Sequence, residues 1–290
     1  MPGRGRLSGR WDHRYRGDRL CGMLSRSGTE SRGGAPMGDT VLVEQRDRAL
    51  IITLNRPEAR NAVDATVAQG VAAAVDELES NKDLSIGVLT GAGGTFSAGM
   101  DLKAFLRGEN VTIEGRGLAG LTEAPPAKPL IAAVEGFALA GGCELVLSCD
   151  LVVASEEATF GIPEVKRGLV AGAGGLLRLP ARIPRQIAME IALTGDRFSA
   201  ADAHRYGLVN RLAEPGQALS GALELADRIT ANAPLALRAT KEIITRSADW
   251  TSDEAFTRQL EIMAPVFAST DAQEGAKAFA EKRAPVWRGE

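Results

Sequence analysis

The chain has 290 residues, which is enough to bury a large core in one or two domains. Its 34 basic and 37 acidic residues give a net charge of −3, so composition offers no electrostatic case for nucleic-acid binding. No apolar run reaches the roughly 20 residues that span a bilayer. Three cysteines without framework spacing favour a reducing, cytoplasmic compartment, and two histidines without zinc spacing predict no metal site.

Residues 1–36 differ in composition from the rest of the chain. They hold eight arginines and no lysine against three acidic residues, a local charge of about +5 that leaves about −8 for the remainder. The segment has no apolar core of the kind that a secretory signal needs. An organellar transit peptide is one reading of its Arg-rich and Ser-rich composition. We expect instead a disordered or extraneous N-terminal arm, with the functional chain beginning near Met37.

From Thr40 the sequence alternates between strand and helix patterns. Residues 41–43 and 50–54 read as paired strands joined by a polar turn. Asp64 can cap a helix over residues 65–78, whose apolar positions recur on one face. This first section therefore predicts a β-β-α unit.

The same alternation continues and then gives way to helices. Short apolar strands are expected at 86–89, 131–134 and 151–154, with a helix from about Gly142 to 147, so stacked β-β-α units of an α/β fold are predicted. After Pro180 the pattern is helical, over residues 186–193, 200–206, 217–232, 234–246, 253–267 and 273–282. We divide the chain into a core at 37–195 and an all-helical region at 196–290.

Two glutamates stand out in the core because each lies among small and apolar residues. Glu144 follows a glycine-rich turn at 140–143, and Glu164 closes the segment 160–163. Burying an ionised carboxylate is costly, so such positions suggest a site that moves protons if the fold brings the two together. Alone, Glu144 also fits a helix N-terminal acid, and Glu164 also fits an ion pair with Lys166 or Arg167.

An ordered series of motifs carries a family resemblance that covers about residues 40–284. The motifs lie at 54–57 with 61–62, 96–103, 136–144, 160–164, 168 with 172–175, 193–195, 200–209 and 281–283. Together they resemble the enoyl-CoA hydratase/isomerase, or crotonase, superfamily. The resemblance implies a spiral of β-β-α turns, assembly as trimers or dimers of trimers, and C-terminal helices that support assembly and complete the CoA site.

The resemblance also implies the reaction and its main groups. Glu144 and Glu164 match the two hydratase glutamates, and the main-chain N–H groups of Met100 and Gly141 match the donors of an oxyanion hole. Possession of both glutamates favours hydration over isomerisation. The predicted enzyme is a lyase that adds water reversibly, in the syn sense, to a trans-2-enoyl-CoA to give a 3-hydroxyacyl-CoA. No cofactor is expected, since coenzyme A is part of the substrate.

Further positions are assigned to substrate binding by the same resemblance. They are Arg56, Ala59, Arg60, Ala62, Ala98, Gly99, Asp101, Leu102, Lys103, Leu139, Gly142, Pro163 and Gly172, with Phe279 and Lys282 reaching the nucleotide end of a neighbouring subunit's ligand. Asp101 is expected to fix its loop. The variable acyl wall of the family falls within residues 107–126.

Several alternatives stay open. They are a 3-enoyl-CoA isomerase, a crotonobetainyl-CoA hydratase-like enzyme, and a non-catalytic acyl-CoA-binding module. Cys143 and Cys149 are expected to be buried packing residues rather than nucleophiles. The apolar stripe Leu176, Leu177 and Leu179 is expected in the core rather than in the acyl pocket.

Overall fold

The computed structural model describes residues 40–290, so the predicted N-terminal arm lies outside the described residues. The described chain belongs to one compact unit, and the proposed boundary between the core and the helical region, at residues 195 and 196, lies within it. Its longest helix, α1, has 16 residues, and no described helix has the length and apolarity to cross a membrane.

Three sheets are formed by the described residues. The largest has six strands in the order β1-β2-β3-β6-β8-β11, antiparallel between β1 and β2 and parallel elsewhere. Its strands are β1 (Val41–Arg46), β2 (Ala49–Leu54), β3 (Ile86–Gly91), β6 (Leu130–Val134), β8 (Leu151–Ser155) and β11 (Arg211–Ala213). The smaller sheets are β10 (Phe198–Ser199), β9 (Thr159–Gly161) and β7 (Phe137–Leu139), and the pair β4 (Thr112–Ile113) and β5 (Gly117–Leu118).

Helices make up most of the rest. They are α1 (Ala65–Ser80), α2 (Leu102–Leu106), α3 (Gly141–Ser148), α4 (Gly175–Arg182), α5 (Arg185–Thr194), α6 (Ala200–Tyr206), α7 (Ala218–Thr230), α8 (Pro234–Arg246), α9 (Ala255–Phe267) and α10 (Thr270–Glu281), with short 3-10 turns η1 (Pro57–Ala59), η2 (Pro163–Arg167) and η3 (Ser247–Asp249). Asp64 caps α1 by accepting a hydrogen bond from Val67 N, as predicted.

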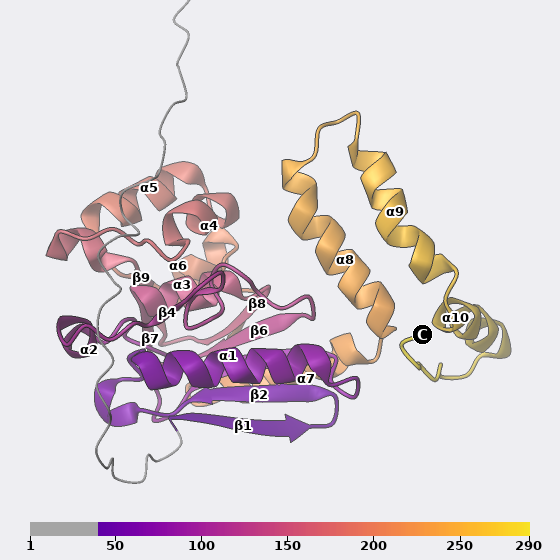
Figure 1. The fold of residues 1–290 in the computed structure, drawn as a ribbon, viewed down its shortest axis with the longest axis horizontal. Helices are drawn as coiled ribbons and strands as arrows, with labels where there is room; N and C mark the ends of the chain where they lie inside the picture. Colours follow the sequence, from indigo (N-terminus) through magenta and orange to yellow (C-terminus); the bar gives the residue numbers. More distant parts are fainter. Residues whose placement is uncertain (1–39) are drawn as a thin grey trace, which may run out of the picture. The chain divides into compact units, whose positions relative to one another are not determined.

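Alternate residues of the large sheet face two different layers. In β2, Leu50 and Ile52 pack with the apolar face of α1, whereas Ala49 and Ile51 pack with α7. This division follows from the period of two in a strand, and both layers are buried because parallel strands here are covered on both sides. Figure 1 shows α1 lying along β1 and β2.

The predicted alternation of strands and helices in the core is confirmed, but the prediction that residues 196–290 are all helical was wrong. The region 196–290 contains the short strands β10 and β11 besides its helices. β11 pairs in parallel with β8 at the edge of the large sheet, and that tertiary pairing decides its conformation where the local pattern is weak.

The small sheet determines where the site lies. β7 and β9 run parallel, with Leu139 opposite Gly161, so their carboxyl ends meet at one edge. Ser97 extends this sheet by a parallel bridge to Ala138. Three segments that are distant in sequence therefore end side by side.

The last three helices, α8 to α10, are much more exposed than the helices of the core. α8 and α9 contain no buried residue, and they run side by side as an antiparallel pair (Figure 1). Lys241 of α8 ties this region to the sheet, since its Nζ donates to Lys128 O at 3.0 Å and to Asp150 Oδ2 at 2.6 Å.

Candidate active site

The parallel ends of β7 and β9 bring the two predicted glutamates into one cavity. β7 turns at Ala140 into α3, whose first turn carries Glu144. β9 turns at Ile162 into η2, where Glu164 follows Pro163. Both glutamates line a cavity of about 1230 Å³, which is large enough to enclose a sizeable ligand.

Glu144 is deeply buried and held by main-chain donors. Its side chain is 3% exposed, and its Oε1 accepts hydrogen bonds from Ala173 N at 2.7 Å and Gly175 N at 2.9 Å, at the start of α4. No described residue donates to Oε2. Burial raises the pKa of Glu144, and the two amides and the charge of Arg178 oppose that rise.

Glu164 is partly buried but contains an atom that is fully enclosed. Within residues 40–290 its Oε2 has no hydrogen-bond partner, which is rare for a buried polar atom and marks a position where an added group would bind. Burial raises the pKa of Glu164, its own amide opposes the rise, and the charge of Glu144 adds to it. Such a carboxyl is suited to holding and delivering a proton.

Two main-chain donors lie at the same edge. The N–H groups of Met100 and Gly141 have no acceptor among the described residues, although both are near the cavity. Gly99 has φ of +90°, and a Cβ there would lie 2.7 Å from Gly141 N, so glycine is required for the two segments to approach. This arrangement can stabilise an oxyanion.

The turn before Gly141 is strained. Ala140 has φ of 51° and ψ of −127°, a conformation that residues with a Cβ rarely adopt. Its N–H donates to Gly161 O at 2.9 Å, so the pairing of β7 with β9 holds this geometry. Strain of this kind is typical of functional sites that the surrounding structure over-determines.

The loop that carries Met100 is fixed by a charge network. Arg56 donates to Ala62 O at 2.7 Å and pairs with Asp64 at 3.1 Å and Asp101 at 3.2 Å. Asp101 also caps α2 by accepting from Lys103 N and Ala104 N. Although burial alone would raise it, hydrogen bonds from Ala104 and Arg56 hold the pKa of Asp101 below its usual value.

Most of the predicted binding residues line the cavity, and a minority do not. Those in the lining are Ala59, Arg60, Ala62, Ala98, Met100, Asp101, Leu102, Lys103, Leu139, Gly141, Glu144, Pro163, Glu164 and Gly172. Arg56, Gly99 and Gly142 lie outside the lining, Arg56 and Gly99 beside the loop of Met100 and Gly142 in α3. Phe279 and Lys282 lie on α10 and at its end, and Phe279 is 87% exposed.

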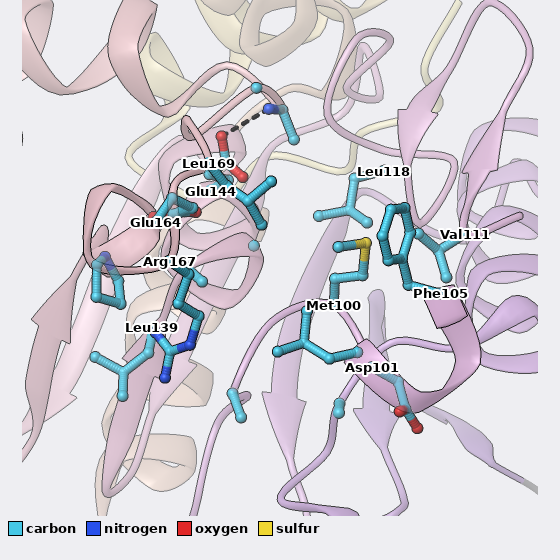
Figure 2. Close-up of a pocket in the computed structure, with 18 of the residues that line it drawn as sticks. Met100, Asp101, Phe105, Val111, Leu118, Leu139, Glu144, Glu164, Arg167 and Leu169 are labelled. Atoms are coloured by element: carbon cyan, nitrogen blue, oxygen red, sulfur yellow. Dashed lines mark hydrogen bonds between the residues drawn. The ribbon is translucent and has the colours of Figure 1, made fainter. Parts of the chain in front are cut away.

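An apolar wall faces the glutamates. Figure 2 shows Glu144 and Glu164 on one side and Met100, Phe105, Val111 and Leu118 on the other. The family resemblance placed this wall only within residues 107–126, and it missed Phe105 of α2 and Leu169. Nothing in their local pattern distinguishes these side chains from core residues.

Other predictions about side chains have clear outcomes. Cys143 and Cys149 are buried, and burial raises the pKa of each thiol to about 12, so their predicted packing role is confirmed. Leu179 is in the core at 1% exposed, but Leu176 and Leu177 are 43% and 80% exposed, so that part of the prediction was wrong. α4 buries only one of its faces.

The comparisons with known proteins agree with this fold. The model of the family described as enoyl-CoA hydratase/isomerase matches residues 44–290. A solved structure of an enoyl-CoA hydratase from Mycobacterium tuberculosis H37Rv is 64% identical, with a TM-score of 0.86, and the match covers 87% of this chain and 100% of that one.

Two curated relatives have different names. Enoyl-CoA hydratase EchA19 of Mycobacterium tuberculosis is 43% identical over 86% of this chain and 96% of its own length. Carnitinyl-CoA dehydratase of Salmonella typhi is 41% identical over 87% of this chain and 100% of its own. The chain belongs to the enoyl-CoA hydratase/isomerase family, with the crotonase fold, and is an enzyme of the hydro-lyase type.

Proposed function

We propose that this protein is an enoyl-CoA hydratase that adds water reversibly to a trans-2-enoyl-CoA and gives a 3-hydroxyacyl-CoA. One observation carries the proposal: a buried carboxyl group, a partly buried one and two main-chain N–H groups without an acceptor in residues 40–290 meet at one edge of the small sheet. Hydration needs both pairs, since water must be activated while a thioester oxygen gains charge.

The two glutamates have different surroundings and so different roles. Glu144 Oε1 receives two main-chain hydrogen bonds, which favour its carboxylate, so we assign it as the base that takes a proton from water. Burial raises the pKa of both glutamates, but only Glu164 has an enclosed oxygen without a donor among residues 40–290, and the charge of Glu144 raises its pKa further, so we assign it as the acid.

The proposed step balances without any further reactant. The thioester oxygen accepts hydrogen bonds from the N–H groups of Met100 and Gly141. The oxygen of water bonds to C3 as Glu144 takes its proton, and the electron pair of the C2=C3 bond passes to C2 through an enolate-like state. The proton of Glu164 then bonds to C2. A proton returns from Glu144 to Glu164 through water in the cavity, so no cofactor is needed.

Cationic side chains on the cavity fit the phosphates of coenzyme A. Arg60, Lys103, Lys166, Arg167 and Arg197 all lie in its lining. We therefore assign the CoA part of the substrate to the rim, with the small residues predicted from the family beside it. Phe279 and Lys282 remain assigned to the nucleotide end of a neighbouring subunit's ligand.

The apolar wall favours an unsubstituted acyl chain. Met100, Phe105, Val111 and Leu118 present no hydrogen-bonding group to it, so a hydrocarbon tail loses nothing by desolvation there. A cationic acyl group is the second candidate, because Glu123 also lies in the lining and could pair with a quaternary ammonium. Because one relative is named carnitinyl-CoA dehydratase, unsubstituted and cationic acyl groups should both be tested as substrates.

A panel of thioesters tests the proposal. The purified protein is mixed with crotonyl-CoA, a longer trans-2-enoyl-CoA, crotonobetainyl-CoA and a 3-enoyl-CoA, and products are followed by loss of conjugated absorbance and by mass. We expect the mass of one water to be added to the first two. Turnover of the 3-enoyl thioester alone, without water, would identify an isomerase. Saturable binding without turnover of any substrate would identify a binding module.

We also propose assembly into trimers or dimers of trimers. α9 and α10 expose large apolar side chains, with Phe256 at 82%, Phe267 at 73% and Phe279 at 87%. Apolar groups gathered on one region are typical of protein interfaces. Light scattering coupled to gel filtration measures the mass, and a monomer at micromolar concentration would contradict the proposal.

A further inference from the structure

Arg178 of α4 lies between the catalytic glutamate and the acyl wall. Its guanidinium folds back over the start of its own helix and occupies the place where a Cβ of residue 174 would otherwise lie. Gly174 has φ of +97° and no side chain, and so leaves the space that the guanidinium occupies. Arg178 thus covers the turn whose amides, Ala173 N and Gly175 N, bind Glu144.

The other end of the guanidinium reaches the cavity wall. Arg178 Nη2 donates to the carbonyl oxygen of Thr122 at 2.5 Å. Thr122 is 1% exposed, and its Oγ1 accepts a hydrogen bond from Leu118 N at 2.9 Å. Leu118 and Glu123 line the cavity. One partly buried cation therefore joins the acyl wall to the helix turn that holds the base.

The charge of Arg178 also acts on Glu144 directly. Burial lowers the pKa of Arg178, and the nearby carboxylate of Glu144 opposes that change. In turn Arg178 favours the ionised form of Glu144. The other titratable groups that face Glu144 are Glu164, from η2, and the thiol of Cys143, which is neutral. Loss of Arg178 would leave the carboxylate with its two amides and without this cation.

We propose that Arg178 is a positioning residue that fixes the turn holding Glu144 relative to the acyl wall and favours the carboxylate form of Glu144. The inference rests on the proposed function, in which Glu144 is the base. It acts through Glu144, so it affects the chemical step more than substrate binding. It also links acyl-chain recognition to catalysis, since the same guanidinium holds the carbonyl of Thr122.

The test compares three variants. Arg178→Gln removes the charge, and Arg178→Lys keeps the charge but not the planar guanidinium. Arg182→Gln removes a partly buried cation one turn later on the same helix. Arg182 donates to Cys149 O at 2.7 Å and has no contact with Glu144, so it is a matched structural control. For each we measure kcat, KM and the pH profile of kcat/KM with the preferred enoyl-CoA, and the Tm.

In Arg178→Gln we expect kcat to fall about 10- to 100-fold with little change in KM, since a misplaced catalytic group has an effect of that order. The acid limb of the pH profile should move to higher pH, because a carboxylate without its cation takes up a proton more readily. In Arg178→Lys the acid limb of kcat/KM should return to the pH of the parent protein, and in Arg182→Gln it should stay at that pH. An unmoved limb in Arg178→Gln, or an equal move in Arg182→Gln, would overturn the inference.

A second measurement does not depend on turnover. The carboxyl carbon of Glu144, identified by its loss in Glu144→Gln, is titrated by NMR in the ligand-free protein, and its pKa should be higher in Arg178→Gln than in the parent. An unchanged pKa rejects the role of Arg178, whereas a parent protein that hydrates no enoyl-CoA rejects the proposed function. Arg178→Met, of similar length, replaces Arg178→Gln if that variant does not fold.

Discussion

The edge where β7 and β9 end holds its two glutamates and the turn at Ala140 by main-chain contacts, whereas much of α8 to α10 is exposed and includes surface ion pairs. Glu144 is bound by two amides, and Ala140 is held in a strained turn by Gly161. In α8 the pair of Arg246 and Glu242 is largely exposed, and such pairs contribute little to stability. The first region therefore has one tightly determined geometry, and the second leaves apolar surface without a cover in a single chain.

The largest expected effect is loss of either carboxyl group. Glu144→Gln and Glu164→Gln should each lower kcat by about 10²- to 10⁴-fold, as expected for a lost general acid or base. Glutamine keeps an oxygen that can accept from Ala173 N and Gly175 N, so the fold should persist. Enoyl-CoA hydration is measured at pH 7, and near-parental rates in both variants would contradict the assignment.

These two variants also make a prediction about stability. A carboxyl whose pKa is raised by folding does not lower the free energy of unfolding at a pH below its pKa in the unfolded state. That free energy falls as the pH rises from this pKa through the higher pKa of the folded state. The parent protein should therefore lose stability over that interval more than Glu144→Gln does. Tm values at pH 5 and pH 8 give the comparison, and a smaller difference in the parent would contradict it.

A methyl group at Gly99 should be the next most harmful change. Its Cβ would lie 2.7 Å from Gly141 N and would displace one donor of the oxyanion site. We expect Gly99→Ala to lower kcat by about 10²- to 10³-fold. Gly108→Ala is the control, because Gly108 also has a positive φ, of +78°, but has nothing within 4 Å of its Cβ position. Equal losses in the two variants would attribute the effect to backbone strain.

The contact between α8 and the sheet should have a moderate effect on stability alone. Lys241→Met removes two hydrogen bonds from a charged donor, to Asp150 and Lys128 O, and should cost about 1–3 kcal/mol. Arg246→Ala on the same helix removes an exposed pair and should cost less than about 0.5 kcal/mol. Urea unfolding at one fixed protein concentration gives both values. Equal losses of unfolding free energy would show that the contacts of Lys241 stabilise the fold no more than an exposed ion pair does.

The smallest effect is expected at Arg167, which is exposed. Its charge lowers the pKa of Glu164 against the larger effect of burial. In Arg167→Gln the alkaline limb of kcat/KM, which reports the acid, should move to higher pH. Lys166→Gln should leave that limb in place, because Lys166 pairs with Asp196 at 2.6 Å. Movement of the acid limb instead of the alkaline limb in Arg167→Gln would reverse the assigned roles, because Glu164 would then be the base.

Local sequence patterns predicted the elements better than the site. The cap at Asp64 and five of the six strands of the large sheet follow from residue type and spacing, whereas β11 was not predicted. The meeting of Glu144 and Glu164 depends on the pairing of two three-residue strands, β7 and β9, which have too few residues for a periodic signal. Only the ordered family motifs predicted that meeting.

Side-chain partners were the hardest feature to predict. Arg56 is bound to Asp101, 45 positions away, and this pairing takes it out of the cavity lining. The apolar character of Leu176 and Leu177 predicted that they are buried. Residue type alone does not show whether another part of the chain covers the face of α4 on which they lie. Partners set by tertiary contacts leave no local mark in the sequence.

The register of β7 against β9 makes activity a reporter of folding. A chain that has formed its large sheet but has not paired Leu139 with Gly161 contains Glu144 and Glu164, yet does not bring the two together in the proposed site. Recovery of turnover during refolding would therefore time the completion of the small sheet, while circular dichroism follows the larger one. The delay between the two signals measures how long after the large sheet the sheet of β7, β9 and β10 is formed.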